Sequence, residues 1–389
     1  MFIADNNEAI VAPPAPATNI HVALELLEAH LARELDKNTL RQDSFDMDDA
    51  PEAQALTPFP ELKAGLDWLE ENVTVPWRDA DKEALHSQTL HKWLALVAII
   101  GGFGAIILAI IQLAIKATAT TGKLETASVV LEVFTAFGAA IAVGFGVYAK
   151  VNHHWLEQRN LAERLRMLKY SALVQFCSLN ADWQGWVKNQ LDAIKQVPDF
   201  QKVKAWSEGG DVDPAVPSGS KCDPQSGSFG ALVLYYQYKR ILFQAQYFER
   251  RRGDYQGKIP RWLHPADLPI FFLSVFLVVV HIVAQHFADH PIFLTCVHWG
   301  TAAVWFGASA AILPILSLGI HSWVGAFELP RSASLCLAKK QALEGAAMQL
   351  RQDSGNALGT IGHMSNVEHF LEQEHREWLR LIIETKWFV

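Results

Sequence analysis

The sequence has few of the motifs that mark soluble enzymes or metal sites. Its four cysteines are Cys177, Cys222, Cys296 and Cys336, and no two of them have the C-x-x-C spacing typical of zinc and dithiol sites. The sequence also lacks H-E-x-x-H, the loop G-x-x-x-x-G-K-[ST], G-x-G-x-x-G after a strand, and G-x-S-x-G. These absences argue against the metalloproteases, nucleotide hydrolases, dinucleotide enzymes and α/β-hydrolases that carry them. We expect a protein that acts without catalysis, cofactor or metal.

Charged residues are nearly absent from four long stretches. Trp93 to Ile115 contains no charge, and Ala127 to Ala149 contains one acid. Two further apolar stretches are Leu268 to Phe287 and one within 292–320. About 20 residues at a rise of 1.5 Å each cross a hydrocarbon layer of roughly 30 Å. Large soluble proteins also bury apolar helices, but four such runs with flanking Lys, Trp and His favour an all-α membrane protein with four transmembrane helices.

The positions of Lys and Arg predict the orientation of these helices. Of the 33 Lys and Arg residues, only Lys116 and Lys123 lie near the first turn, and the second turn, ADHP, has none. Because basic residues concentrate on the cytoplasmic side, both hairpins should turn outside and both termini should be cytosolic. Three of the four cysteines would then lie in the cytosol, where disulfides are uncommon, so we expect them to be reduced and structural.

The cytosolic parts are helical by pattern. In 19–37, apolar residues recur with a helical period from Ile20 to Leu35, and Asn19 is a candidate N-cap. Pro-rich and acidic stretches around this helix are typical of linkers. We expect an acidic N-terminal region (1–90), the first hairpin with a helical extension (91–175), a cytosolic helix and flexible loop (176–228), a basic helix with the second hairpin (229–330), and C-terminal helices (331–389).

We expect the second apolar stretch to continue without a break, as one helix, into the charged segment KVNHHWLEQRNLAERLRMLKY (150–170) and on to about Val174. Arg159 and Glu163 are spaced for an i,i+4 ion pair, and Glu163 and Arg166 for an i,i+3 pair. The charges could cover a solvated helix face. They could instead pair with a second helix or subunit and fix its register just below the membrane.

The start of this helix carries His153, His154 and Trp155. Trp is enriched at the membrane–water interface, so we interpret these residues as interface anchors. Adjacent histidines face different directions on a helix and make a poor metal site. A role in pH sensing is a further interpretation, because His titrates near neutrality.

One acid and three histidines lie within the apolar stretches. Glu132 is in the second, His281 and His286 are in the third, and His298 is in the fourth. Ionisable groups inside a membrane are costly and commonly mark a pathway or a protein contact. Glu132 could line a pore or meet a partner, or it could reach the headgroups from the outer end of its helix. The histidines could act similarly or form hydrogen bonds within the helix bundle.

A basic cluster precedes the third apolar stretch and consists of Arg250, Arg251, Arg252, Lys258 and Arg261. It could anchor the protein to anionic membrane lipids or hold an anionic ligand such as a nucleotide or oligonucleotide. The net charge of −8 argues against general nucleic-acid binding by the whole chain.

The segment EHFLEQEH places Glu368, Glu372 and His375 on one helical face. A carboxylate-bridged metal bundle would need a second E-x-x-H helix, which the sequence lacks. We therefore expect this face to be a solvated amphipathic surface.

Three helical segments carry a resemblance to a known family. They are WLEQRNLAERLR, RILFQAQYFERR and VEHFLEQEHREWLRLI. They resemble the SLATT family, the SMODS- and SLOG-associating two-transmembrane effector domain. Trp155, Arg159 and Glu163 match its Trp and R-x-x-x-E pattern, whereas Glu374 and Trp378 are one residue further apart than its closing E-x-x-W. Two hairpins depart from the single hairpin of that family, and we interpret them as two in tandem.

The resemblance implies an effector in the bacterial inner membrane that forms pores when a nucleotide signal from a partner synthase arrives. We expect a regulated homo-oligomeric channel in anti-phage defence. One alternative is a transporter or membrane enzyme subunit that uses Glu132 and the span histidines for protons or metal. Another is a membrane scaffold that recruits a soluble partner through its N-terminal region.

Overall fold

The computed structural model describes residues 20–36, 54–118, 123–178, 182–195, 199–209, 219–258, 267–289, 299–326, 329–353 and 355–384. These residues are almost all helical, and their only β-type pairing is an isolated antiparallel bridge between Ser178 and Ser220. The prediction of an all-α protein is confirmed. Asn19, Arg261 and His298, as well as the Pro-rich and acidic N-terminal stretches up to residue 53 other than 20–36, lie outside the described residues.

The first half of the chain is built around one long helix of 43 residues, α4. The elements are α1 (Ile20–Asp36), α3 (Pro60–Leu69), the π-helix η1 (Glu70–Thr74), α4 (Val75–Ala117), α5 (Lys123–Tyr148), α6 (Val151–Cys177), α7 (Trp183–Lys195) and α8 (Phe200–Glu208). Both α5 and α6 pack along α4.

The second half repeats much of this order. Its elements are α9 (Gly227–Tyr236), the π-helix η2 (Gln237–Leu242), α10 (Phe243–Lys258), α11 (Asp267–Asp289), α12 (Trp299–Ala326), α13 (Leu329–Gln352) and α14 (Ala357–Glu384). In each half a helix with an internal π segment leads towards an apolar helix pair. The helix that follows the pair, α6 or α13, packs back along the helix that led in, α4 or α10.

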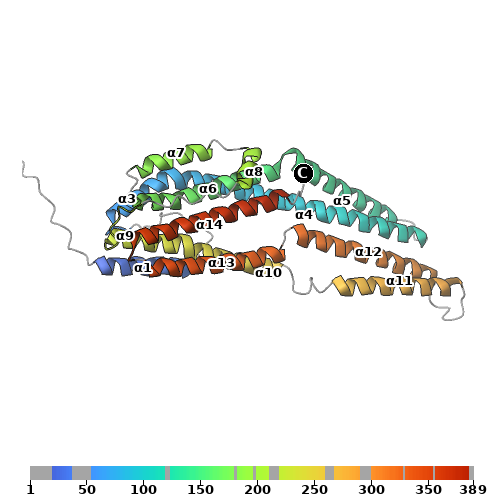
Figure 1. The fold of residues 1–389 in the computed structure, drawn as a ribbon. Helices are drawn as coiled ribbons and strands as arrows, with labels where there is room; N and C mark the ends of the chain where they lie inside the picture. Colours follow the sequence, from blue (N-terminus) through green and yellow to red (C-terminus); the bar gives the residue numbers. More distant parts are fainter. Residues whose placement is uncertain are drawn as a thin grey trace, which may run out of the picture.

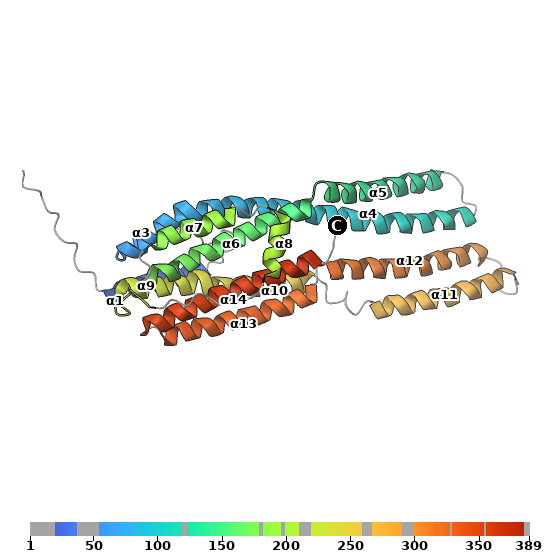
Figure 2. The ribbon, with the colours of Figure 1, turned by 45° about the horizontal axis from the view of Figure 1, so that its top comes forward.

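The molecule is elongated, with a helical bundle at one end and two apolar helix pairs at the other (Figures 1 and 2). The pairs are the C-terminal part of α4 with α5, and α11 with α12. The four helices are long and apolar enough to cross a membrane. The predicted number of candidate spans is thus confirmed, and α12 contacts α4 where the two pairs meet.

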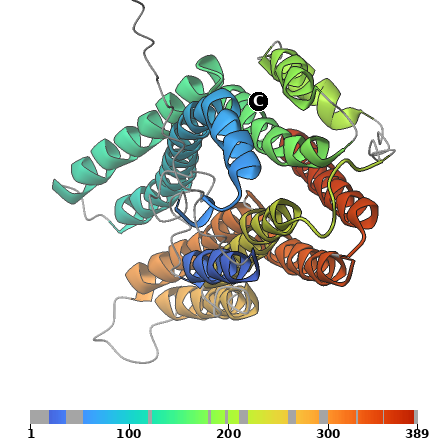
Figure 3. The same ribbon diagram turned by 90° about the vertical axis from the view of Figure 1, so that its left-hand side faces the viewer.

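One large core cluster holds most of the bundle together, and a small second cluster joins α6, α8 and α14. The large cluster includes Leu27 and Leu31 of α1, Leu173 of α6, Tyr235 of α9 and Ile361 of α14, all nearly inaccessible to solvent. Figure 3, an end-on view, shows α1 lying beside α9. The regions expected at 1–90, 176–228 and 331–389 therefore share the large cluster. The boundary expected at residue 90 lies inside α4.

Two different contacts hold the apolar pairs. In the first pair the backbones of α4 and α5 approach closely, and in the second a side chain of α11 bonds to a carbonyl of α12 that has no donor within its own helix. A Cβ atom at Gly101 of α4 would lie 2.8 Å from the carbonyl oxygen of Thr135 on α5, so only glycine permits this approach. In α12, Pro314 has no N–H to donate to the carbonyl of Ala310. The hydroxyl of Ser274 on α11 donates to that carbonyl at 2.9 Å and thereby replaces the lost helix bond.

Candidate functional site

The candidate site is a buried polar network in the bundle, beside the point where the apolar helices begin. Its first element is α6, which begins directly after a break in the helical backbone. Lys150 has φ 48° and ψ 38°, in the left-handed region, between the end of α5 at Tyr148 and the start of α6 at Val151. The prediction of one continuous helix was wrong, because this left-handed residue interrupts the helix between α5 and α6. The two helices run in the same direction, α5 along the C-terminal part of α4 and α6 along its N-terminal part (Figure 2).

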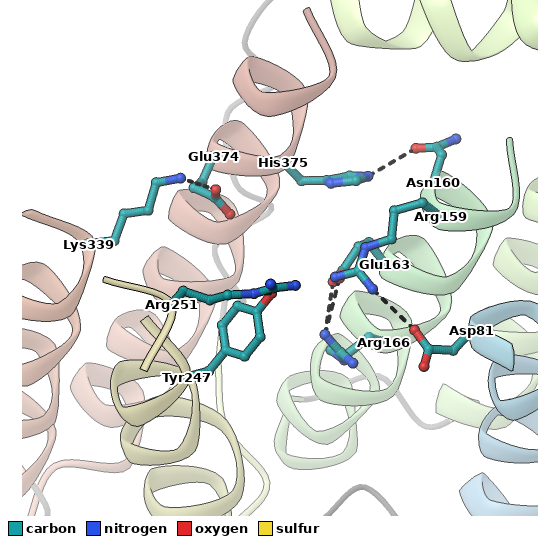
Figure 4. Close-up of polar contacts among 10 residues, drawn as sticks. All are labelled: Asp81, Arg159, Asn160, Glu163, Arg166, Tyr247, Arg251, Lys339, Glu374 and His375. Atoms are coloured by element: carbon teal, nitrogen blue, oxygen red, sulfur yellow. Dashed lines mark hydrogen bonds and ion pairs between the residues drawn. The ribbon is translucent and has the colours of Figure 1, made fainter. Parts of the chain in front are cut away.

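Arg159, Glu163 and Arg166 lie close together on α6, as the spacing predicts (Figure 4). Glu163 forms ion pairs with Arg159 and with Arg166, the latter at 3.1 Å. Arg159 also donates to Asp81 of α4 at 3.1 Å. The side chains of Arg159 and Asp81 are only 22% and 15% exposed, so this face pairs with a second helix instead of facing water.

The electrostatics of this cluster favour its charged form. Burial alone would raise the pKa of Glu163, but the guanidinium groups of Arg159 and Arg166 outweigh it and lower this pKa to about 2. Glu163 is therefore ionised throughout the physiological pH range. The ion pair of Arg159 with Asp81 fixes the register of α6 against α4, because a shift of one turn would leave these partly buried charges unpaired.

Helix α14 contacts α6 close to the cluster of Arg159 and Glu163. His375 lies 3.3 Å from the side-chain oxygen of Asn160 on α6 (Figure 4). Burial lowers the pKa of His375 to about 3, so its ring is neutral at physiological pH. Glu374 pairs with Lys339 of α13, and burial raises the pKa of this carboxyl.

The second half of the network lies in the π-helix η2, where sequence reasoning expected no special site. Arg240 forms a two-pronged ion pair with Glu368 of α14, with N–O distances of 2.8 and 2.6 Å. Tyr236 donates its hydroxyl to the same carboxylate at 2.8 Å, and the Arg240 guanidinium lies 4.7 Å from the ring centre of Tyr170. A short π segment widens the helix and is often found at functional sites.

The neighbouring Lys239 ties η2 to the N-terminal region. Its ammonium group lies 2.6 Å from the carboxylate of Glu34 on α1, and Tyr238 donates to Glu28 of α1 at 3.1 Å. The adjacent charges Lys239 and Arg240 thus contact α1 and α14 respectively. The sequence does contain a signal for this site, because Lys239 and Arg240 are two adjacent charges in the mostly apolar and aromatic run LVLYYQYKRILF.

The expectation of a solvated face for EHFLEQEH was wrong. Glu368 is 6% exposed and His375 is 6% exposed, because both point into the bundle towards Arg240 and Asn160. Glu372 remains partly exposed and pairs with Arg376 one turn along the helix at 2.7 Å. Among the described residues, no group of three or more His, Cys, Asp or Glu is arranged to hold a metal ion.

Trp155 lies in an aromatic cluster between the bundle and the apolar helices. It is 8% exposed, stacks on His91 of α4 and meets Trp378 of α14 edge-on. The interpretation of Trp155 as a lipid anchor is wrong, because protein side chains cover its ring. The ring of His153 stacks on that of Phe200 in α8, and the two ring centres are 3.8 Å apart.

His154 extends the contact between α6 and α4. Its ring nitrogen lies 3.1 Å from a carboxylate oxygen of Glu83 on α4, and both side chains are about half exposed. Together with the pair of Arg159 and Asp81, this gives two polar contacts between α6 and α4.

Helix α8 is attached to α14 through its C-terminal end. Arg376 and Arg380 of α14 donate to the carbonyl oxygens of Gly209 and Ser207, which lie at that end. Such donors satisfy carbonyls that have no partner within their own helix. Arg376 also lies over the ring of Trp206, with its guanidinium carbon 4.6 Å from the ring centre.

The polar residues of the apolar helices differ in their surroundings. The ring of His281 lies 2.6 Å from the carbonyl oxygen of Ala303 on α12, so it bonds within the helix pair. His286 is exposed near the end of α11. The side chain of Glu132 is partly exposed on α5 and makes no hydrogen bond or ion pair with the residues that the structure describes.

The basic cluster at the end of α10 is partly engaged with groups of the protein. Arg251 donates to the hydroxyl of Tyr247 at 3.0 Å (Figure 4). The carboxylate of Glu249 attracts both Arg252, at 3.6 Å, and Lys340 of α13, at 3.2 Å. Arg250 and Lys258 lie in the same helix, α10.

The network is suited to holding helices in register, since it consists of paired charges, capped carbonyls and stacked rings. It connects α4, α6 and α14 in one cluster and α1, η2 and α14 in the other. Comparison with family models, with curated proteins and with solved structures finds no match for this chain. The resemblance to the SLATT family therefore depends on the sequence motifs alone.

Proposed function

We propose that the protein is a regulated membrane pore, formed by several copies of the chain and controlled by its helical bundle. The carrying observation is the continuity of α4, one helix of 43 residues. Its N-terminal part bears Asp81 and Glu83, which contact α6 of the bundle, and its C-terminal part is apolar enough to cross a membrane. A helix transmits displacement along its axis, so a change in the bundle would move this apolar segment.

In this proposal α6 is the coupling element. It is joined to α5 through Lys150 and to α4 through Arg159 and His154. A shift of α6 along α4 would break the contacts with Asp81 and Glu83 together. Two discrete registers separated by such ion pairs provide the bistable element that a gate requires.

Several copies are proposed because one chain encloses little of its own apolar surface. In each of the four apolar windows, no more than 11% of the residues are buried within the chain. Glu132 lies on α5 near exposed apolar residues such as Phe134 and Phe137. An acid is costly against lipid, so this side of α5 would face another copy or an aqueous path.

The membrane location follows from the Lys and Arg distribution together with the apolar helices. We place the bundle and both termini in the cytosol and the two turns of the helix pairs outside. The SLATT resemblance supports a bacterial inner membrane, a role in anti-phage defence, and gating by a nucleotide or oligonucleotide from a partner synthase. Arg250 and its basic neighbours would hold this ligand or the anionic membrane lipids at the cytosolic surface.

The transporter alternative receives less support, because His281 bonds to a backbone carbonyl of α12, and no group of three or more His, Cys, Asp or Glu among the described residues is arranged to hold a metal ion. The scaffold alternative also receives less support, because recruiting a partner does not require a helix such as α4, which continues from the polar network into an apolar segment. A conductance measurement separates a pore from both.

The test is the membrane potential of bacteria that express the chain from a tight promoter, with Asp81→Asn and Asp79→Asn variants. Asp81 contacts Arg159, whereas Asp79 is exposed two residues away on the same helix, which makes it a matched control. If the ion pair holds the pore closed, Asp81→Asn should depolarise the cells at lower expression than the parent chain and Asp79→Asn should not. Equal potentials in all three strains and in cells without the chain would contradict the proposal.

A further inference from the structure

Two cysteines from distant parts of the sequence meet at one point of the bundle. The Sγ atoms of Cys177, at the C-terminal end of α6, and Cys222, just before α9, are 2.9 Å apart. The described cysteines, which also include Cys336, are free thiols. A disulfide needs about 2.05 Å between sulfurs, so a displacement of under ~1 Å would bring the pair to bonding distance.

The backbone around the pair is held in place by several polar contacts. Ser178 and Ser220 form the isolated antiparallel bridge, and the amide of Lys221 donates to the carbonyl of Cys177 at 3.1 Å. The hydroxyl of Ser220 donates to the same carbonyl at 3.2 Å and accepts from the amide of Cys222 at 3.1 Å. The two thiols therefore remain neighbours because their backbones are joined, and not through a chance contact of side chains.

The two thiols have different environments. Cys177 is fully buried, whereas Cys222 is half-buried beside the exposed Lys221. The hydrogen bond between the two thiols, together with burial, raises the pKa of the Cys177 thiol. The same hydrogen bond, with the nearby ammonium of Lys221, lowers the pKa of Cys222. An accessible thiolate beside a buried thiol is the arrangement of an attacking and a resolving cysteine.

We propose that Cys222 and Cys177 are a reversible redox site, with Cys222 as the attacking thiol, Cys177 as the resolving thiol, and a small disulfide such as oxidised glutathione as the oxidant. The expectation that these cysteines serve only as structural thiols changes accordingly. Disulfides in a cytosolic protein are usually transient and redox-sensing, which fits a half-buried pair.

The reaction balances in two exchange steps. The Cys222 thiolate attacks one sulfur of oxidised glutathione, forms a mixed disulfide and releases one glutathione thiolate. Cys177 then loses its proton and attacks Sγ of Cys222, which releases the second glutathione thiolate. Glutathione is reduced to two thiols, which take up the two protons that the cysteines lose, and the protein dithiol is oxidised to a disulfide.

The bond would fasten two elements of the bundle that carry the polar network. Helix α6 bears Arg159 and Glu163, and the segment after Cys222 leads through α9 into η2 with Arg240. Oxidation would tie the C-terminal end of α6 to the start of the second half of the chain. The site stands on the thiol geometry and does not depend on the pore proposal.

The test uses the full-length chain in its membrane and begins without substitutions. After treatment with oxidised glutathione and alkylation, peptide mapping should find the peptides of Cys177 and Cys222 joined, and dithiothreitol should separate them. The mixed disulfide in the parent chain should stay below about a tenth of the joined product, since the neighbouring thiol has a high effective concentration. Two alkylated, unjoined cysteines would overturn the proposal.

Two variants then assign the roles of the thiols. Cys177→Ala should accumulate a glutathione adduct on Cys222, because the resolving thiol is missing. Cys222→Ser should leave Cys177 without adduct, because burial shields it. An adduct on Cys177 in the Cys222→Ser chain, with none on Cys222 in the Cys177→Ala chain, would contradict the assignment. Cys336→Ala is the control, and should still give the joined peptides.

Discussion

The buried ion pair between Arg240 and Glu368 offers the sharpest prediction about what holds the bundle together. Their side chains are only 4% and 8% exposed, and Glu368 accepts two hydrogen bonds from Arg240 and one from Tyr236. Glu368→Gln keeps the size of the side chain but removes its charge and turns one acceptor into a donor. The guanidinium would then remain buried without a counter-charge.

Breaking a buried pair by removing one partner costs about 3–5 kcal/mol. A loss of 1 kcal/mol shifts the melting temperature of a domain of 150–250 residues by about 2–4 °C, so Glu368→Gln should lower it by at least about 5 °C. Glu372→Gln is the matched control, because Glu372 lies one turn away in a partly exposed pair with Arg376. Exposed i,i+4 pairs contribute about 0.2–0.5 kcal/mol, so the control should melt within about 2 °C of the parent chain.

The assay is thermal unfolding of the full-length chain in one detergent, followed by circular dichroism. Arg240→Met combined with Glu368→Met should recover most of the loss, because two apolar side chains leave no buried charge. Equal melting temperatures for Glu368→Gln and Glu372→Gln would refute the reasoning. A double variant that is less stable than Glu368→Gln alone would also refute it.

Two further predictions concern pH and the apolar helices. Because the folded-state pKa of His375, about 3, lies below the unfolded value near 6.5, its neutral ring contributes stability above pH 6.5 that is lost as pH falls towards 3. His375→Gln should therefore make the melting temperature less dependent on pH between 6 and 4, and an unchanged pH dependence would contradict this reasoning. Ser274→Ala leaves the carbonyl of Ala310 without its donor and should weaken the packing of α11 on α12 by about 0.6–2 kcal/mol. Hydrogen exchange in α12 should then rise next to Pro314, and an unchanged rate there would show that the serine is dispensable.

Much of the fold could be predicted because its signals are local. Helix periodicity and the apolar stretches located every candidate span, and the R-x-x-x-E spacing located the cluster of Arg159 and Glu163. The helix break at Lys150 was missed, because a left-handed lysine between two helices has no sequence signature comparable to that of glycine. The sequence also placed Trp155 at the lipid interface, since enrichment statistics cannot see that α4 and α14 cover the ring.

The second polar cluster was missed because its members are far apart in the chain. Arg240 and Glu368 are 128 residues apart, and the amphipathic pattern of α14 indicates only that one face is polar. Whether that face meets water or a buried guanidinium depends on the packing of η2. The meeting of Cys177 with Cys222 likewise depends on tertiary packing, as 45 residues separate them.

The most direct test of the pore proposal is ion flux through the purified chain in liposomes loaded with a potential-sensitive dye. We predict that the Asp81→Asn chain passes ions faster than the parent chain, and that Glu132→Gln alters the conductance. The Asp79→Asn chain should behave as the parent does. Flux no greater than that of empty liposomes for the parent and for Asp81→Asn, with the protein shown to be folded and inserted, would contradict the account.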